Sequence, residues 1–353
     1  LSEKAHEQSI EVFSLNLERL LLQPPVKNKM VLGFDPAFRT GCKLAVVDKN
    51  GNMLDVSVIY PTPPNAKIKE AKQKMLQLLK EYPIDIIAIG NGTASRESEA
   101  FVASLIREYH LNVAYTIVSE AGASVYSASK LARDEFPELH VEQRSAISIA
   151  RRILDPLSEL IKIDPQSIGV GQYQHDLPTA RLKERLDFVV SKAVNRVGVN
   201  VNTASQELLK NISGLSQATA KSIVEYRKAN GELKNRKELK KIPKIGAKSY
   251  EQAAGFLRIE DGDEMLDRTS IHPESYAVAR RVLQQLSIAS QDMGSEQAQE
   301  AVKQADVDAL IKACESDRYT IQDILEAIAT PLRDYRDRYD APLLRSDVLE
   351  LED

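Results

Sequence analysis

Two acidic residues stand where the sequence places the ends of buried strands. Asp35 closes the apolar run 30–34, and Glu120 follows the apolar run 113–118. Ligand crevices of α/β sheets lie at the carboxyl ends of their strands. If the two strands are neighbours, both carboxylates converge on one point, as divalent-metal nucleases require. A turn-forming aspartate and a helix-capping glutamate fit the same spacing, so both interpretations stay open.

A glycine-rich turn provides a second candidate site. Gly90-Asn91-Gly92-Thr93 follows the apolar run 84–89, and Ser95 opens the next helix. Backbone amides of such a turn can receive a phosphate at the helix N-terminus. Asn91, Gly92 and Thr93 are therefore phosphate-loop candidates, and a plain strand-to-helix turn is the alternative. The Walker-type GxxxxGK[ST] motif does not occur.

The third candidate is an internal repeat. Leu209, Ile212 and Leu215 recur thirty residues later as Leu239, Ile242 and Ile245, which predicts two helical hairpins. Each turn resembles the helix-hairpin-helix motif, whose Gly-hydrophobic-Gly turn offers backbone amides to phosphates. The candidate nucleic-acid ligands are Gly214, Leu215, Ser216 and Lys221 in the first copy, and Lys244, Ile245, Gly246 and Lys248 in the second.

Both copies depart from that motif. Ser216 replaces the second glycine of the first turn, and Lys244 replaces the first glycine of the second turn. Contacts to phosphates position a protein without distinguishing bases, so the predicted binding is nonspecific and salt-sensitive. Hairpins used only for packing are the alternative.

Hydrophobic periodicity predicts the elements that hold these residues. Helical spacing predicts helices, and short apolar runs bounded by turn residues predict strands. Asn50-Gly51 predicts a β-hairpin. The predicted strands cover 30–35, 43–47, 53–60, 84–89 and 113–118, and the predicted helices cover 5–22, 66–81, 96–109, 122–135 and 143–154. A hairpin followed by strands that alternate with helices indicates a mixed α/β sheet covered by helices.

The rest of the chain is predicted to be helical apart from an exposed loop at 165–178. An amphipathic helix follows at 179–197, and later helical stretches cover 277–286 and 321–328. We predict five parts: a helix of an upstream domain at 1–25, the α/β domain at 26–163, a loop and connecting helix at 164–199, the double hairpin at 200–259, and an acidic helical segment with a linker at 260–353.

Charge is distributed unevenly along the chain. All 353 residues carry 47 basic and 51 acidic side chains, a formal charge of -4. Residues 200–259 carry 12 basic and 5 acidic side chains, whereas residues 260–353 carry 10 and 22. A compact basic block is typical of a nucleic-acid-binding module, and a solvated lysine-rich helix surface is the alternative.

The lengths of the apolar runs and the cysteine content indicate where in the cell the protein is expected to work. The longest apolar runs are far shorter than a membrane helix, and the chain has only two cysteines, Cys42 and Cys314, at no metal-ligand spacing. We therefore expect a cytoplasmic protein with no membrane partner.

The motif at 35–41, Asp-Pro-Ala-Phe-Arg-Thr-Gly, resembles the ribonuclease-H-like superfamily in its resolvase-like YqgF branch. Active members carry further acids on a late helix. Residues 143–154 contain no Asp or Glu, and Ser145 and Ser148 stand where such an acid is expected. The resemblance implies an RNase H-like fold that has lost catalysis and requires no cofactor. If the site is active, Asp35 and Glu120 would bind Mg²⁺ or Mn²⁺.

Longer stretches at 90–97, 119–127, 163–176 and 201–205 resemble the Tex family of bacterial transcription accessory proteins. This resemblance covers essentially the whole chain. It implies a nucleic-acid-binding factor, expected to be a monomer, that binds RNA, DNA or both and acts with the transcription machinery. The family's N-terminal helical region and C-terminal S1 RNA-binding domain are expected to lie outside this chain. The alternative function is a metal-dependent nuclease or resolvase that uses Asp35 and Glu120.

Overall fold

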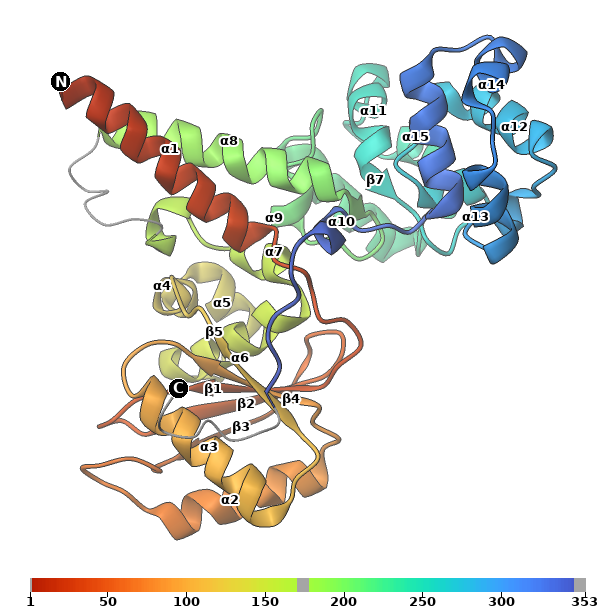
Figure 1. Cartoon of the computed structure of the whole chain (residues 1–353). Helices are drawn as coiled ribbons and strands as arrows, with labels where there is room; N and C mark the ends of the chain where they lie inside the picture. Colours follow the sequence, from red (N-terminus) through yellow and green to blue (C-terminus); the bar gives the residue numbers. More distant parts are fainter. Residues whose placement is uncertain (1, 170–177, 346–353) are drawn as a thin grey trace. The chain divides into compact units, whose positions relative to one another are not determined.

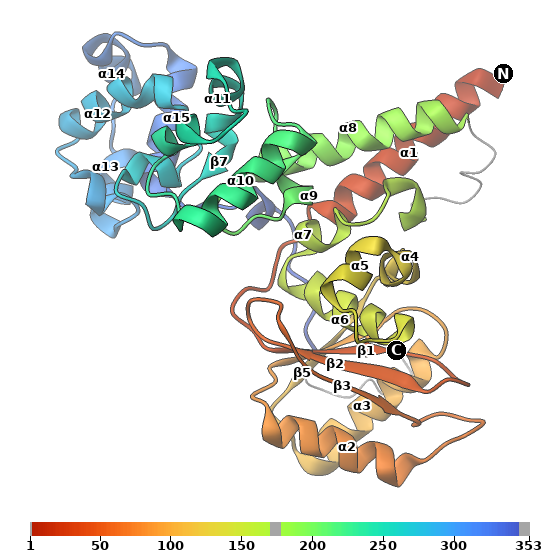
Figure 2. The same cartoon turned by 180° about the vertical axis from the view of Figure 1, so that it is seen from behind.

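The computed structural model describes residues 2–169 and 178–345. The chain forms two compact units, one of residues 1–189 and 338–353 and the other of residues 190–337 (Figures 1 and 2). Most of the predicted loop at 165–178 and the last eight residues of the predicted linker lie outside the described residues. In the described parts of the chain, no helix is long and apolar enough to cross a membrane.

A five-stranded mixed sheet forms the centre of the first unit, as predicted. Its order is β3-β2-β1-β4-β5; the pairs β1–β2 and β2–β3 are antiparallel, whereas β1–β4 and β4–β5 are parallel. The strands are β1 (Val31–Asp35), β2 (Cys42–Val47), β3 (Met53–Ile59), β4 (Ile86–Gly90) and β5 (Ala114–Val118). At the free edge of β5, the backbone of Tyr115 pairs with that of Arg345.

Helices cover both faces of the sheet (Figures 1 and 2). Helices α2 (Ile68–Glu81) and α3 (Ser95–Tyr109) bury one face, and α6 (Val141–Leu154) buries the other. Alternate residues of β1 point to opposite faces, so Val31, Gly33 and Asp35 share the face that α6 covers. A Cβ atom at Gly33 would lie 2.0 Å from the carbonyl oxygen of Ala146, so glycine is what lets α6 approach β1 this closely.

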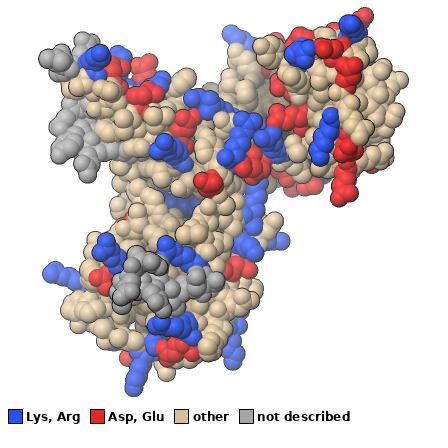
Figure 3. All heavy atoms as spheres, in the orientation of Figure 1, with Lys and Arg blue, Asp and Glu red and all other residues tan. Residues whose placement is uncertain are grey.

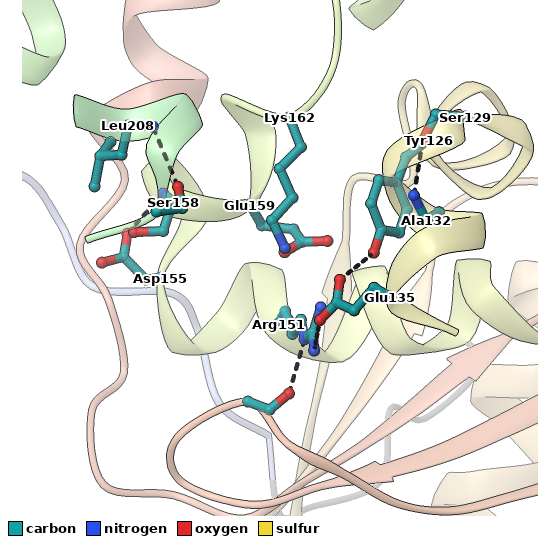
Figure 4. A network of polar contacts seen from close by, with 12 residues as sticks. Tyr126, Ser129, Ala132, Glu135, Arg151, Asp155, Ser158, Glu159, Lys162 and Leu208 are labelled. Atoms are coloured by element: carbon teal, nitrogen blue, oxygen red, sulfur yellow. Dashed lines mark hydrogen bonds and ion pairs between the residues drawn. The ribbon is translucent and has the colours of Figure 1, made fainter. Parts of the chain in front are cut away.

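Arg151 ties α6 to its surroundings (Figure 4). Its guanidinium donates to the carbonyl oxygen of Gly51 in the β2–β3 turn (2.8 Å) and pairs with Glu135 (2.7 Å). Glu135 in turn accepts a hydrogen bond from the hydroxyl of Tyr126 (3.2 Å). These contacts orient the helix that faces Asp35.

The single helix predicted at 122–135 is wrong. Two short helices, α4 (Ala123–Ala128) and α5 (Lys130–Glu135), stand there instead. Ser129 separates them because its hydroxyl accepts a hydrogen bond from the Ala132 amide and so starts a new helix. The other first-unit helices are α1 (Ser2–Leu21), α7 (Pro156–Leu160) and the start of α8 (Thr179–Val197).

The second unit contains the predicted hairpins. The first comprises α9 (Gln206–Leu209) and α10 (Gln217–Asn230), and the second comprises a 3-10 helix (Arg236–Lys241) and α11 (Ala247–Ala253). The short strands β6 (Val199–Asn200) and β7 (Leu257–Arg258) pair in parallel.

A C-terminal helical domain completes this unit. It has its own apolar core and comprises α12 (Tyr276–Gln285), α13 (Glu296–Lys303), α14 (Val307–Cys314) and α15 (Arg318–Ala329). Two of its helices correspond to the predicted stretches 277–286 and 321–328.

Arg236 joins the second hairpin to the C-terminal helical domain. Its side chain is buried, with 1% exposed, and donates to the carbonyl oxygens of Leu257, Thr269 and Ile271 at 2.6–2.7 Å. It also donates to the hydroxyl of Tyr276 (2.6 Å), which is bonded to buried Asp267. A buried guanidinium is tolerated only when its donors are satisfied in this way.

We expect Arg236→Met to lower the free energy of unfolding of the second unit by about 3–5 kcal/mol, because it leaves three carbonyl oxygens and the Tyr276 hydroxyl buried without their charged donor. Urea denaturation followed by circular dichroism measures the loss, and hydrogen exchange assigns it to residues 190–337. The exposed neighbour Lys237 is the control, and Lys237→Met should change stability by less than about 0.5 kcal/mol. Equal stability of both variants would contradict this role for Arg236.

Candidate functional site

The two predicted acids do not stand on neighbouring strands. β4 lies between β1, which ends in Asp35, and β5, which precedes Glu120. The carboxylates nevertheless approach across the end of β4, because Gly90 has no side chain. A Cβ there would lie 2.6 Å from Oε2 of Glu120 and 3.3 Å from Cδ of Pro36. Burial, and then the charge of Asp35, raise the pKa of Glu120.

Asp35 is held by α6 and by the neighbouring strand. The hydroxyl of Ser145 donates to its Oδ2 at 2.5 Å. Lys43 is its cross-strand partner in β2. Burial raises the pKa of Asp35, and the charge of Glu142 adds to this, whereas the Ser145 hydrogen bond and the charge of Lys43 oppose it. Ionising Asp35 in this environment therefore costs free energy.

The prediction that the late helix supplies no acid is wrong. α6 begins at Val141, two residues before the predicted start, because the backbone amide of His140 bonds to the Gln143 side chain and caps the helix there. Glu142 therefore lies in its first turn. Its carboxylate does not stand free beside Asp35, because it forms an ion pair with Lys43 at 3.0 Å.

These side chains form a poor metal site. Across residues 2–169 and 178–345, no group of three or more His, Cys, Asp or Glu side chains is placed to hold a metal ion. Asp35 and Glu120 supply two carboxylates, and Ser145 occupies a position where an acid was expected. The ammonium group of Lys43 pairs with Glu142, and its charge lowers the pKa of Asp35.

The glycine-rich turn is occupied by a carboxylate of the chain. The Gly92 amide bonds to Glu120, and the Glu120 amide donates to Oδ1 of Asn91 (3.1 Å). A Cβ at Gly92 would lie 1.7 Å from Oε1 of Glu120. A pocket of about 430 Å³ opens beside this turn at the start of α3, lined by Phe38, Asn91, Gly92, Ala94, Ser95, Arg96 and Glu97. A phosphate at Asn91, Gly92 and Thr93 would have to displace Glu120.

The first hairpin turn is closed by its own side chains. Gly214 has φ of +82°, and a Cβ there would lie 2.6 Å from Cβ of Gln252 on α11. Ser216 begins α10 in a capping box: its amide donates to Thr219 Oγ1 (2.7 Å), and its hydroxyl accepts from the Thr219 amide (3.3 Å). The serine that departs from the motif therefore works as a helix cap.

The second turn repeats the same backbone with different side chains. Lys244 has φ of +71°, the left-handed conformation that Gly214 has in the first turn. The Leu215 and Ile245 amides donate to the carbonyl oxygens of Ile212 and Ile242, respectively, at 3.0 and 3.2 Å. Gly246 precedes α11 and offers no side chain to cap it.

The candidate lysines differ in their surroundings. Lys221 lies 3.6 Å from Glu225, one helical turn away, so an intrahelical ion pair engages it. Lys244 and Lys248 are exposed and form no ion pair with any residue that the structure describes. Nearby Lys240 lies 4.5 Å from the ring centre of Tyr250, a contact that sequence reasoning missed. Arg236, counted in the basic block, is buried and contributes no surface charge.

In the C-terminal helical domain, unlike at α11, aspartate side chains cap the starts of two helices. Asp306 caps α14 by accepting from the Asp308 and Ala309 amides, and Asp317 caps α15 by accepting from the Thr320 amide. Acidic side chains are spread over this domain (Figure 3). The starts of α14 and α15 are thus occupied by negative charge.

Three family models match this chain. They are the Tex protein YqgF-like domain at residues 29–154, the helix-hairpin-helix motif at 194–258 and the HHH domain at 264–336. The first two confirm the predicted YqgF-like and double hairpin parts. The third shows that the C-terminal helical domain is a second helix-hairpin-helix domain. The sequence predicted only a helical segment there, because the Gly-hydrophobic-Gly pattern did not reveal this domain.

Relatives align with the whole chain. The uncharacterized protein YdcI of Bacillus subtilis is 54% identical over 100% of this chain and 49% of its own length. Transcriptional accessory protein Tex of Neisseria gonorrhoeae is 46% identical over 100% of this chain and 46% of its own length. Human S1 RNA-binding domain-containing protein 1 is 36% identical over 100% of this chain and 41% of its own length. The chain spans about half the length of these relatives. The chain is thus Tex-like: it carries the YqgF-like domain of Tex proteins together with two helix-hairpin-helix domains.

Proposed function

We propose that this chain binds nucleic acid through its first helix-hairpin-helix domain, residues 194–258. The turns 212–216 and 242–246 would offer backbone amides to phosphates, assisted by Lys221, Lys244 and Lys248. RNA, DNA or both would be bound without sequence preference, since phosphate contacts carry no base information. The basic charge of residues 200–259 supports this proposal.

One observation carries it: the second turn presents unpaired lysines on a motif-like backbone. Lys244 and Lys248 have no carboxylate partner among the residues placed by the structure, so their charges remain available to a phosphate. Lys244 keeps a backbone conformation that costs a non-glycine residue about 1–2 kcal/mol. A lysine at a position that favours glycine is better explained by its charge than by the turn.

The second helix-hairpin-helix domain is a poor phosphate binder by the same reasoning. Asp306 and Asp317 already occupy the amides that start α14 and α15. Their carboxylates would repel a phosphate at those positions. We therefore assign it a supporting role, through Arg236, beside the binding domain.

The wider role follows from the relatives. A transcriptional accessory protein and an S1 RNA-binding domain-containing protein are among them, which supports action with the transcription machinery. We expect such a factor to work in the cytoplasm as a monomer.

We propose further that the YqgF-like domain acts as a scaffold without metal-dependent cleavage. Ser145 supplies a hydroxyl to Asp35 at a position where an acid was expected, and Glu142 is bound to Lys43. The nuclease alternative remains testable because the charge of Glu142 raises the pKa of Asp35, and the charge of Asp35 raises the pKa of Glu120.

Lys244→Gly and Lys248→Glu should each weaken binding of single-stranded RNA and DNA of any sequence. Glycine suits the left-handed turn at 244, so Lys244→Gly removes the charge and preserves the backbone. The slope of log affinity against log salt concentration should fall by about 1 for each phosphate that the variant no longer binds. Fluorescence anisotropy over a salt series measures both effects.

The matched control is Lys303→Glu, which reverses an exposed lysine in the acidic domain and should leave affinity unchanged. Unchanged affinity in both turn variants would rule out the second turn as the binding site. A loss equal to theirs in Lys303→Glu would indicate general attraction rather than a defined site.

Labelled single strands and four-way junctions incubated with Mg²⁺ or Mn²⁺ should remain uncut by the wild-type chain. Gel electrophoresis detects cleavage products. Cutting that Asp35→Asn abolishes would establish the nuclease alternative, whereas cutting that persists in Asp35→Asn would point to a contaminating enzyme.

Asp35→Asn should raise the urea midpoint at pH 7.5. Burial raises the pKa of Asp35, so ionised Asp35 destabilises the fold above that pKa. This cost disappears as the pH falls through the raised pKa toward the ordinary aspartate value, and the advantage of asparagine should shrink accordingly by pH 4.

Asp48→Asn is the control of opposite sign. Burial opposes the shift, but hydrogen bonds from Asn52 and Asn50 hold the pKa of Asp48 below its usual range. Its charge thus stabilises the fold at neutral pH, and that stability is lost as the pH falls through the lowered pKa. Asparagine should lower the urea midpoint at pH 7.5. If both variants shift the midpoint in the same direction, this electrostatic account is wrong.

A further inference from the structure

Strand β5 forms one edge of the five-stranded sheet. Along an edge strand, the backbone groups of successive residues point alternately toward the sheet and away from it. The Ala114 amide points inward, where it donates to the carbonyl oxygen of Asp85 at 3.1 Å. The backbone groups of Tyr115 and Ile117 therefore point outward. Such an edge is able to pair with an extended chain that reaches it.

The chain itself supplies an extended residue to this edge. The Tyr115 amide donates to the carbonyl oxygen of Arg345 at 2.7 Å, and the Arg345 amide donates to that of Tyr115 at 2.8 Å. An exchange of both hydrogen bonds is the mark of an antiparallel strand pair. The side chains of such a pair lie on one face of the sheet, and Arg345 accordingly forms an ion pair with Glu99 of α3 at 3.6 Å.

The antiparallel register determines how this pairing would continue. In the described parts of the chain it is an isolated bridge. Two residues further along β5, Ile117 would stand opposite Leu343, at the next position where both hydrogen bonds form. The side chain of Ile117 is 39% exposed and that of Leu343 is 68% exposed, so their pairing would remove apolar surface from water.

The proline in this segment fits the same register. Pro342 would stand opposite Val118, whose carbonyl oxygen points inward and accepts from the Asn91 amide. The added strand needs no amide at that position, so a proline is tolerated there.

We propose that residues 341–345 form a strap that closes along β5 as an added strand, pairing Leu343 with Ile117 beyond the pair of Arg345 with Tyr115. The strap keeps the edge of β5 from pairing with a second copy of the chain, since an uncovered edge strand with an exposed apolar side chain favours association. Both partners belong to the first unit, so this inference is independent of the proposed nucleic-acid binding by the hairpins.

Amide hydrogen exchange of the full chain, followed by nuclear magnetic resonance, tests the strap. Arg345→Pro removes the amide that donates to Tyr115, so the Tyr115 and Ile117 amides should exchange at least about tenfold faster than in the wild type. Leu344→Pro is the matched control, because the amide of residue 344 points away from β5 in this register and both rates should stay unchanged.

A second control separates the backbone of Arg345 from its side chain. Arg345→Ala keeps the amide and loses only the ion pair with Glu99, so exchange at Tyr115 should accelerate by less than about threefold.

Sedimentation velocity tests the protective role. Arg345→Pro should form a dimer at concentrations where the wild type and Leu344→Pro remain monomeric. Adding Ile117→Lys to Arg345→Pro should abolish that dimer, because a charge on an edge strand opposes edge-to-edge pairing.

Three results would contradict the proposal. Equal exchange of both amides in the wild type and in Arg345→Pro would overturn the strap. Protection of Tyr115 but not of Ile117 in the wild type would overturn its closure along β5. Faster exchange in Arg345→Pro without a dimer would overturn the protective role. Circular dichroism verifies that the variants fold, which we expect because residue 345 lies outside the five strands.

Discussion

The second unit depends on one buried guanidinium. The guanidinium of Arg236 donates hydrogen bonds to three backbone carbonyl oxygens and to the hydroxyl of Tyr276. The backbone amide of Arg236 donates to Asp267 at 2.7 Å. Those acceptors come from β7 and from the segment 267–276 that begins the second helix-hairpin-helix domain. The first domain contributes the arginine, and the second contributes the carbonyl oxygens of Thr269 and Ile271 and the Tyr276 hydroxyl, so each satisfies polar groups that the other must bury. This exchange explains how an acidic domain can support a basic one without sharing its surface chemistry.

The two helix-hairpin-helix domains of this chain share a type of backbone but differ in the charge that their turns and helix starts carry. In the first domain, Lys244 and Lys248 leave positive charge open around the second turn. In the second domain, Asp306 and Asp317 cap α14 and α15 with charge of the opposite sign. A shared fold therefore does not imply a shared ligand, since the ligand depends on side chains at the turns. The YqgF-like domain follows the same logic, because Ser145 and Lys43 occupy its acidic edge without changing the sheet.

Most of the fold could be predicted from the sequence because its signals are local. The strands, the β2–β3 hairpin and the long helices follow from periodicity within a few residues, and the repeat 209–215 with 239–245 identifies two equivalent hairpins. The errors occur where one side chain changes a boundary. Ser129 divides a predicted helix, and the His140–Gln143 cap starts α6 early enough to include Glu142. The candidate site was predicted as a set of residue types, whereas the pairing of Glu142 with Lys43 was not, since the two are distant in sequence.

The sequence by itself determined the domain order, the turns that could bind phosphate and the acids that end two strands, because each depends on neighbouring residues and their spacing. Only the tertiary structure decided which charges remain available. It inserted β4 between the strands of Asp35 and Glu120, neutralised Glu142 with Lys43, buried Arg236 and left Lys244 and Lys248 unpaired in the described chain. The physical reason is that a charge acts through its nearest partners and its exposure to water, and both are set by residues that meet only when the chain folds.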